Sequence, residues 1–303
     1  MEWNLKILGS SSALPTDARM LSGQLLSTTS HHFLFDCGEG TQFQLRKFGA
    51  PFSKIDTIFL SHLHGDHIFG LFGLLSTYHM YKRQKPLKIF GQKGIIELIG
   101  SVMKTANTRI DYPFEIIELN SEKSELIFED EEVEVFSLPL KHSVSTSGFY
   151  VVAKPGMLNI RKEFVEEHNI PYSWFARIKN GEDYINDNGQ VFKNKDITLP
   201  RAKPKSFAYV TDTAFIPDLS SHIREVDLLY HEATFANEHQ QDARQKLHST
   251  AQDAAKVARD AKAKKLVIGH FSTRYMNADT LVEEACEIFP ETFAAFDGMD
   301  INF

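Results

Sequence analysis

One stretch, FLSHLHGDHIFG (residues 59–70), constrains the fold of this chain more than any other. It places three histidines and one aspartate (His62, His64, Asp66 and His67) within six residues, directly after the apolar run IDTIF. Such a run is typical of a buried strand, where four side chains of this kind have no place. The segment therefore predicts a strand that ends either in a solvated turn or in a binding site.

The spacing within this stretch favours a metal site. His62 and His64 are two residues apart, so an extended chain points both to the same side. Gly65 permits a sharp turn, after which Asp66 and His67 begin the next helix. The four side chains then converge at the carboxyl end of a strand, where ligands gather in α/β sheets. Imidazole and carboxylate without thiolate are typical of hydrolytic rather than structural zinc, and they also suit manganese or iron.

Further ligand candidates lie in corresponding places along the chain. His142 follows the apolar run VEVFSLPLK, Asp212 follows SFAYVT, and His270 follows KLVIG. The first cluster cannot complete the coordination of two metals alone. Since each candidate comes just past a strand, we expect all three to join that cluster.

The rest of the chain alternates strand-like and helix-like segments, which predicts an α/β fold of one large domain or two small ones. The stretch STAQDAAKVARDAKA predicts a packing helix with Ser249 or Thr250 as its N-cap. Cys37 and Cys286 are too few for a disulfide framework and fit a reducing compartment. No signal peptide and no apolar run of membrane-spanning length is recognised. We therefore expect a cytoplasmic protein without a membrane partner.

Residues of about 154–205 break the regular pattern. The formal net charge of the chain is −7, so any polyanionic partner must meet a local basic surface. This segment supplies one, with Tyr172, Trp174, Phe175 and Tyr184 interleaved. Its ten cations outnumber its seven anions: Lys154, Arg161, Lys162, Arg177, Lys179, Lys193, Lys195, Arg201, Lys203 and Lys205 against Glu163, Glu166, Glu167, Glu182, Asp183, Asp187 and Asp196. Composition alone is equally compatible with a plain surface insertion that has a small apolar cluster of its own.

Several motifs together resemble one family. FDCGEGTQFQL, HLHGDHIFGLFGLL, HEATF, HSTAQDAA and GHFSTRY are similar to those of tRNase Z, the short bacterial-type tRNA 3′-processing endoribonucleases of the metallo-β-lactamase superfamily. The resemblance runs from LGSSSALP to AAFDGMDINF, nearly the whole chain. It implies one metallo-β-lactamase-like domain over residues 1–303, a four-layer αβ/βα sandwich with an inserted flexible arm at about 154–205.

The resemblance also implies a catalytic site. Zinc 1 takes His62, His64 and His142, zinc 2 takes Asp66, His67 and His270, and Asp212 bridges the two ions. Asp66 also accepts a proton from the bridging water, His248 stabilises the phosphate or protonates the leaving oxygen, and Glu232 orients His248 and supplies protons. Arg19 lies in the N-terminal loop that is near the substrate's 3′ end in relatives, which makes it a candidate substrate contact. The planar fork of Arg274 suits a phosphate contact, and a structural ion pair is the alternative.

In that family the enzyme acts as a homodimer on tRNA precursors, and the arm grips the tRNA for the partner's active site. Water attacks a phosphodiester, leaving a 3′-hydroxyl on the tRNA and a 5′-phosphate on the trailer. The present chain departs from the family pattern in two places. The arm reads HNIPYSWFARIKNG without a Gly-Pro-rich knuckle, and the N-terminal loop reads PTDARM, with Asp17 and Met20 where Lys and Asn are usual. The cleavage position and the response to an encoded CCA therefore stay open.

Three alternatives compete with this interpretation. A general phosphodiesterase or small-ester hydrolase would use the same metals, although the basic arm and HSTAQ disfavour it. A nuclease of the β-CASP branch needs a large inserted domain, for which this chain has no room. A catalytically inactive RNA-binding module would need a defect in the ligand set, and all seven ligand residues are present.

Overall fold

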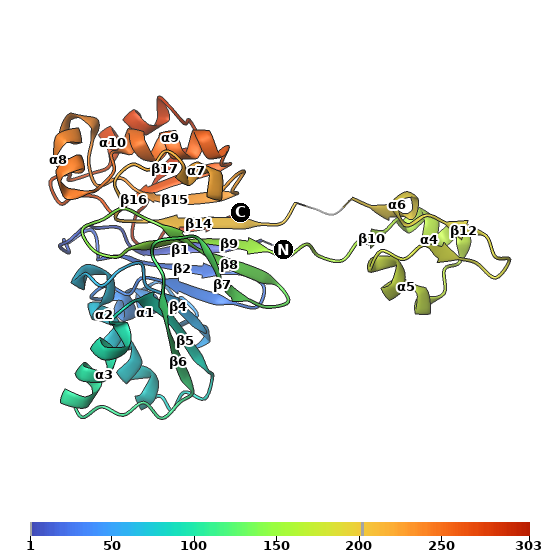
Figure 1. Ribbon diagram of the computed structural model, residues 1–303, viewed down its shortest axis with the longest axis horizontal. Coiled ribbons are helices and arrows are strands. Elements are labelled where there is room, and N and C mark those ends of the chain that lie inside the picture. The colour runs from blue at the N-terminus through green and yellow to red at the C-terminus, as the bar shows by residue number, and fades with distance from the viewer. Residues whose placement is uncertain (1, 201–202) are drawn as a thin grey trace. The chain divides into compact units, whose positions relative to one another are not determined.

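The computed structural model describes residues 2–200 and 203–303 (Figure 1). The chain divides into two compact units. Unit 1 comprises Met1–Glu129, Glu134–Val151 and Lys205–Phe303, and unit 2 comprises Asp130–Val133 and Val152–Pro204. Unit 2 thus coincides closely with the arm expected at about 154–205, of which Arg201 and Ala202 lie outside the described residues.

Two mixed sheets form the centre of unit 1. In the described part of the chain the first sheet has seven strands, in which β1, β2 and β3 are antiparallel neighbours while β3 to β6 run parallel. Its spatial order is β18 (Asp300–Asn302), β1 (Asn4–Gly9), β2 (Gly23–Ser27), β3 (His32–Phe35), β4 (Thr57–Phe59), β5 (Leu87–Gln92) and β6 (Phe114–Leu119).

The second sheet also has seven strands within residues 2–200 and 203–303, and β14 to β17 run parallel. Its order is β17 (Thr292–Ala294), β16 (Lys265–Gly269), β15 (Leu228–Glu232), β14 (Ser206–Val210), β9 (Ser147–Ala153), β8 (Val133–Pro139) and β7 (Glu125–Glu129). In each sheet the parallel strands extend from the middle of the sheet to an edge strand, β6 or β17, and their carboxyl ends are aligned.

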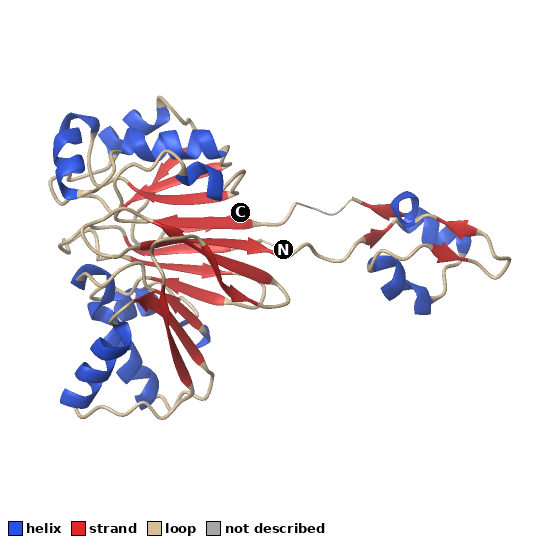
Figure 2. Cartoon of the chain, viewed as in Figure 1, coloured by secondary structure: helices blue, strands red, loops and turns tan. Residues whose placement is uncertain are grey.

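Helices lie outside both sheets (Figure 2). The first sheet is accompanied by α1 (Thr41–Lys47), η1 (Phe52–Lys54), α2 (Gly65–Met80) and α3 (Ile95–Thr105). The second is accompanied by α7 (Leu219–His222), η2 (Asn237–His239), α8 (Gln240–Lys246), α9 (Ala251–Ala261) and α10 (Asp279–Cys286). The predicted α/β class and αβ/βα layering are confirmed. Among the described residues, no helix combines the length and apolarity needed to cross a membrane.

Strand β3 shows why both faces of the first sheet are buried. Phe35 points between the sheets, where its ring lies 5.4 Å from that of Phe207 and 5.8 Å from that of Phe149. Its neighbour Leu34 points the other way and joins the apolar cluster under α2 that includes Leu71. A strand buried on both faces reads as a continuous apolar run rather than an alternating one, as FLF (residues 33–35) does.

Helix α9 begins with the cap that its sequence predicts. Thr250 is the N-cap and its side chain accepts a hydrogen bond from the backbone of Asp253, whose carboxylate accepts one from the Thr250 N–H. This reciprocal capping box satisfies two otherwise unpaired donors. Ser249, the other candidate, instead donates to the carbonyl of Thr213 at 2.7 Å.

Unit 2 has its own small core, as its aromatic content suggested. Ile170, Ile178, Tyr184 and Ile197 are buried together, with Trp174 among the side chains packed on them. The surrounding elements are β10 (Asn159–Ile160), α4 (Lys162–His168), α5 (Tyr172–Lys179), β11 (Tyr184–Ile185), β12 (Val191–Phe192), α6 (Asn194–Ile197) and β13 (Thr198–Leu199). Strands β10 and β13 pair in antiparallel orientation.

Candidate metal centre

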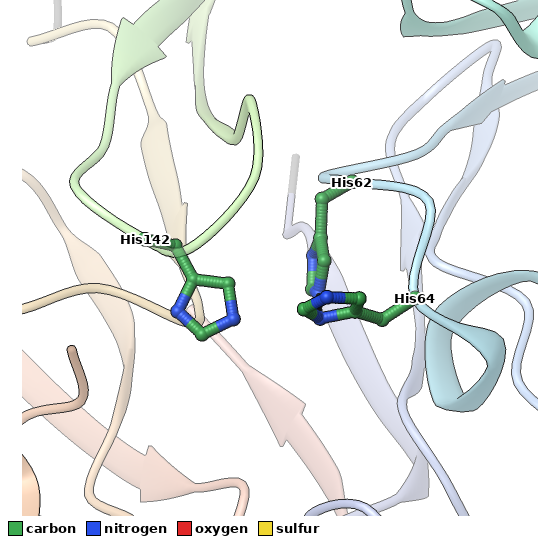
Figure 3. Close-up of side chains that lie close together, drawn as sticks. All are labelled: His62, His64 and His142. Carbon is green, nitrogen blue, oxygen red and sulfur yellow. Dashed lines mark hydrogen bonds between the residues drawn. The ribbon is translucent and has the colours of Figure 1, made fainter. Parts of the chain in front are cut away.

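Loops that follow strands bring the predicted ligands together. His62 follows β4, and His64 is the N-cap of α2 in extended conformation, so Asp66 and His67 occupy the first turn of that helix. His142 comes after β8, Asp212 after β14 and His270 after β16. Among the described residues, ligand atoms within 4.8 Å of one another form five overlapping groups. Three consist of predicted ligands alone: His62, His64 and His142; His62, His67 and Asp212; and Asp66, His67 and His270. The other two include His248: His142, Asp212 and His248; and Glu232, His248 and His270. Figure 3 shows the first group, in which His142 faces His62 and His64 from a separate loop.

Asp212 lies at the middle of this cluster. Its Oδ2 is 3.7 Å from Nε2 of His62 and 3.8 Å from Nε2 of His142. Its Oδ1 is 3.2 Å from Nε2 of both His67 and His270. One carboxylate therefore presents a separate oxygen to each half of the histidine set, which is the placement expected of a bridging ligand.

The backbone at two of these positions adopts a conformation that side chains other than glycine rarely take. Asp212 has φ 43° and His270 has φ 56°. Such a left-handed residue costs about 1–3 kcal/mol and persists where the surrounding structure fixes it. Here the conformation turns the chain sharply at the end of β14 and of β16, so that both side chains point into the cluster.

Each of four histidines has its Nδ1 next to a polar group outside the cluster. Nδ1 of His62 lies 2.9 Å from Ser61 Oγ and Nδ1 of His142 lies 3.2 Å from the carbonyl of Leu247. Nδ1 of His270 lies 3.0 Å from Thr234 Oγ1, and Nδ1 of His67 lies 2.7 Å from Asp36 Oδ2. Such partners hold the proton on Nδ1 and leave the Nε2 lone pair for a metal.

Asp36 contacts the cluster but was not among the residues that the sequence analysis singled out. Its side chain is fully buried and accepts hydrogen bonds from the Ser61 backbone at 2.7 Å and from the Tyr209 hydroxyl at 2.7 Å. Burial lowers the pKa of His67, but the Asp212 and Asp36 carboxylates outweigh it and raise this pKa well above its ordinary value. The signal was present in HHFLFDCG, where Asp36 comes just past a strand, as His142, Asp212 and His270 do.

The residues fit a divalent metal. Nε2 of His67 and Nε2 of His270 are buried and have no hydrogen-bond partner among the described residues. Burial raises the pKa of Asp212, but the neighbouring histidines hold it well below its ordinary value, so the carboxylate keeps its negative charge. A buried anion beside imidazole nitrogens without partners is the environment that a metal ion completes.

Glu232 and His248 form a pair beside this cluster. Glu232 ends β15 fully buried, and its Oε1 lies 2.9 Å from Nδ1 of His248. The His248 ring lies 5.1 Å from that of His142 and 5.6 Å from that of His270. Burial lowers the pKa of His248, but the Glu232 carboxylate outweighs it and raises the pKa to about 9. His248 is therefore protonated at neutral pH in the metal-free protein.

The two arginines predicted to contact substrate are engaged within the protein. Arg19 Nη2 donates to the carbonyls of Tyr275 and Met276 at 2.9 and 3.1 Å, which ties the N-terminal loop to the loop after His270. Arg274 Nη1 donates to Asp242 at 3.1 Å. The N-terminal loop also reaches the cluster directly, because the Ala13 N–H donates to Oδ2 of Asp66 at 3.0 Å.

Two facing mixed sheets with outer helices and a His/Asp cluster at the strand ends define a metallo-β-lactamase fold protein. Family models match two parts of the chain: "Anti-Pycsar protein Apyc1" over residues 3–155 and "Beta-lactamase superfamily domain" over residues 197–271. Curated relatives match at full length. Ribonuclease Z of Bacteroides thetaiotaomicron is 39% identical over 301 residues, 99% of this chain and 95% of that protein. Ribonuclease Z of Cytophaga hutchinsonii is 40% identical over 299 residues, 98% of this chain and 95% of that protein.

Solved structures agree. The short form of human tRNase Z has a TM-score of 0.72 at 29% identity and covers 98% of each chain. YhfI from Bacillus subtilis, a metallo-β-lactamase fold protein, has a TM-score of 0.70 at 18% identity over 100% of this chain and 99% of its own, a likeness of fold alone. The chain belongs to the ribonuclease Z family, endoribonuclease hydrolases of the metallo-β-lactamase superfamily.

Proposed function

We propose that this protein is a zinc-dependent endoribonuclease that removes the 3′ trailer of tRNA precursors. The observation that carries the proposal is the Glu232–His248 pair placed beside a buried His/Asp cluster, in a chain that matches ribonuclease Z proteins along its whole length. A hydrolase of small esters needs a metal-activated nucleophile but no separate buried proton donor for a ribose leaving group.

The seven clustered residues would hold two metal ions. His62, His64 and His142 form one half and Asp66, His67 and His270 the other, with Asp212 between them. Bound there, zinc supplies an activated water nucleophile and neutralises charge on the phosphate. Manganese and iron also suit this oxygen and nitrogen donor set.

The protein's own groups handle the protons. Asp66 accepts the proton of the attacking water, and the Ala13 N–H at 3.0 Å holds its carboxylate in place. As the bond between phosphorus and the 3′-oxygen breaks, protonated His248 donates its proton to that oxygen. Glu232 keeps His248 oriented and protonated until then. The tRNA then ends in a 3′-hydroxyl and the trailer begins with a 5′-phosphate.

The basic arm is the proposed tRNA grip. Arg161, Lys193 and Lys195 line a groove of about 660 Å³ within unit 2, and cations of this kind neutralise backbone phosphates. Arg274, one-third exposed at its side chain, and Arg19 are the proposed phosphate contacts near the cut. The planar fork of each guanidinium suits phosphate oxygens.

We also propose that the protein acts as a cytoplasmic homodimer in which the arm serves the partner's site. Several large apolar side chains on α1 and at the C-terminal half and end of α2 support a protein interface. Phe43 is 71% exposed, Met80 76% and Tyr81 62%. A group of exposed apolar side chains on neighbouring helices is typical of an interaction surface.

Cleavage of an end-labelled tRNA precursor with a 3′ trailer tests the activity. We expect one cut at or near the discriminator nucleotide, strongly reduced in His248→Ala. His222→Ala, which removes an exposed histidine of α7, serves as the matched control and should cleave like the parent. Intact precursor together with rapid hydrolysis of bis(p-nitrophenyl) phosphate would instead identify a general phosphodiesterase.

A further inference from the structure

Thr234, two residues past the end of β15, contacts both halves of the proposed catalytic machinery. Its side chain is buried. The sequence analysis gave this residue no role. Its Oγ1 lies 2.6 Å from Oε2 of Glu232 and 3.0 Å from Nδ1 of His270. The carbonyl oxygen of His270 is also 3.0 Å away, and Nδ1 of His248 is more distant at 3.4 Å.

The chemistry of a hydroxyl decides the direction of these bonds. A threonine hydroxyl has one proton to donate and lone pairs to accept with. The 2.6 Å contact with the Glu232 carboxylate has the length of a charge-assisted O–H···O⁻ bond, so the proton goes to Glu232. Oγ1 then accepts from His270, which requires the hydrogen of that imidazole to sit on Nδ1.

The position of the proton on Nδ1 determines what Nε2 of His270 can do. With the hydrogen on Nδ1, the lone pair is on Nε2, which is buried, has no hydrogen-bond partner in the described chain and lies 3.2 Å from Oδ1 of Asp212. Thr234 thus directs the lone pair of His270 to the place where the cluster would receive a cation.

A second hydroxyl of the cluster, that of Ser61, supports this interpretation by a parallel arrangement. Ser61 Oγ lies 2.9 Å from Asp36 Oδ2 and 2.9 Å from Nδ1 of His62. There too a buried hydroxyl stands between a buried carboxylate and the Nδ1 of a predicted ligand. The same chemical sequence of carboxylate, hydroxyl and imidazole therefore occurs twice, from unrelated segments of the chain.

We propose that Thr234 is a positioning residue that fixes the Nδ1–H tautomer of His270 and, through the same hydroxyl, the carboxylate of Glu232 that holds His248. The inference deepens the proposed function and rests on it. A single hydroxyl then links the metal half of the site to its proton donor, although Thr234 itself touches neither substrate nor metal.

Two substitutions at this position separate the hydroxyl from the packing. Thr234→Val keeps the shape and removes the hydroxyl, whereas Thr234→Ser keeps the hydroxyl. Thr292→Val is the matched control, because Thr292 is also buried and donates to a carbonyl, that of Phe289, away from the cluster. Circular dichroism and thermal unfolding establish that each variant is folded.

Two measurements other than activity test the role. Nitrogen NMR of the histidines in the metal-free protein reports the tautomer of His270, and competition with a chelator reports the affinity for zinc. In Thr234→Val we expect loss of the fixed Nδ1–H tautomer and a zinc affinity lower by about 10–100-fold, the usual effect of removing a partner that orients a ligand. Thr234→Ser and Thr292→Val should both resemble the parent. On a cleaved substrate, Thr234→Val should lower kcat and leave KM unchanged.

Opposite results would overturn the proposal. These are parental zinc affinity and an unchanged His270 tautomer in Thr234→Val, or an equal loss in Thr234→Ser. Failure of the proposed function looks different: the parent would bind zinc and leave tRNA precursor intact, while the comparison of Val and Ser at position 234 would still decide the role of the hydroxyl. If the parent binds no zinc, the proposed metal centre is wrong. The tautomer of His270 in the parent and in Thr234→Val then decides the role of the hydroxyl.

Discussion

Oε1 of Glu232 lies 2.9 Å from Nδ1 of His248, a contact between a fully buried carboxylate and a nearly buried imidazole. The backbone N–H of Thr213 at 2.7 Å donates to the same oxygen. The Glu232 carboxylate is therefore held by a neutral backbone donor and by the His248 imidazole, which is the cationic partner. This pair places a protonated imidazole beside the cluster, as the proposed role of His248 in proton donation requires.

Removing the negative charge of Glu232 should lower the pKa of His248. Burial lowers the pKa of His248 and Glu232 raises it, with a net value of about 9. In the metal-free protein with Glu232→Gln we expect this pKa to fall towards or below its ordinary 6.5. Because the folded-state pKa of the parent is raised, the pair stabilises the fold fully below pH 6.5 and loses that contribution as pH rises through about 9. NMR titration of the imidazole checks the pKa, and an unshifted His248 would contradict the account.

Replacing Asp36 should weaken metal binding without contact to the metal. Asp36→Asn removes the charged acceptor at Nδ1 of His67, so we expect zinc affinity to fall by about 10–100-fold. Asp56→Asn is the matched control, since Asp56 is a largely buried carboxylate 3.4 Å from His31, a histidine outside the predicted ligand set. Chelator competition on all three proteins is the measurement. Equal affinities in parent and Asp36→Asn would refute the role of Asp36.

The core between the sheets should be sensitive to loss of a single ring. Phe35 is fully buried among the rings of Phe59, Phe149 and Phe207, so Phe35→Ala should cost about 3–5 kcal/mol of unfolding free energy. Phe296→Ala removes a ring that is 60% exposed and should cost about 0.5 kcal/mol or less. Denaturant unfolding of the two variants measures the difference, and similar costs would contradict the burial pattern.

The exposed apolar side chains on α1 and α2 should control oligomeric state. In a Phe43→Glu, Met80→Glu double variant we expect charge burial to prevent association, giving a monomer by light scattering where the parent is a dimer. Phe296→Glu, at an exposed phenylalanine near the C-terminus, should leave the dimer intact. A parental monomer, or a double variant that still dimerises, would exclude this surface as the interface.

The sequence predicted which of these side chains come together because their positions follow a simple topological rule. Strands β4, β14 and β16 lie inside parallel runs, so residues just past their ends share one edge, and His62, Asp212 and His270 could be assigned to one cluster. The same rule applied to HHFLFDCG would have found Asp36. Thr234 and Ser61 were beyond reach, since a hydroxyl gains its role only from the partners that tertiary packing places around it.

Arg19 and the arm each have contacts that the sequence did not predict. Arg19 donates to the carbonyls of Tyr275 and Met276, and no local pattern identifies backbone acceptors so distant in the chain. Its contact with a substrate phosphate stays a prediction. The arm predicted by charge has a core built from Ile170, Ile178 and Ile197. These side chains are spread over short elements without a regular period, so periodicity could not reveal them.

The most direct test of the central claim is removal and return of the metal with analysis of both product ends. The protein is treated with a chelator, dialysed and assayed on an end-labelled tRNA precursor before and after addition of zinc. We expect cleavage to stop with the chelator and return with zinc, giving a tRNA with a 3′-hydroxyl and a trailer with a 5′-phosphate. Undiminished cleavage by the metal-free protein, or a tRNA product that ends in a 2′,3′-cyclic phosphate, would contradict a metal-dependent hydrolysis at the His/Asp cluster.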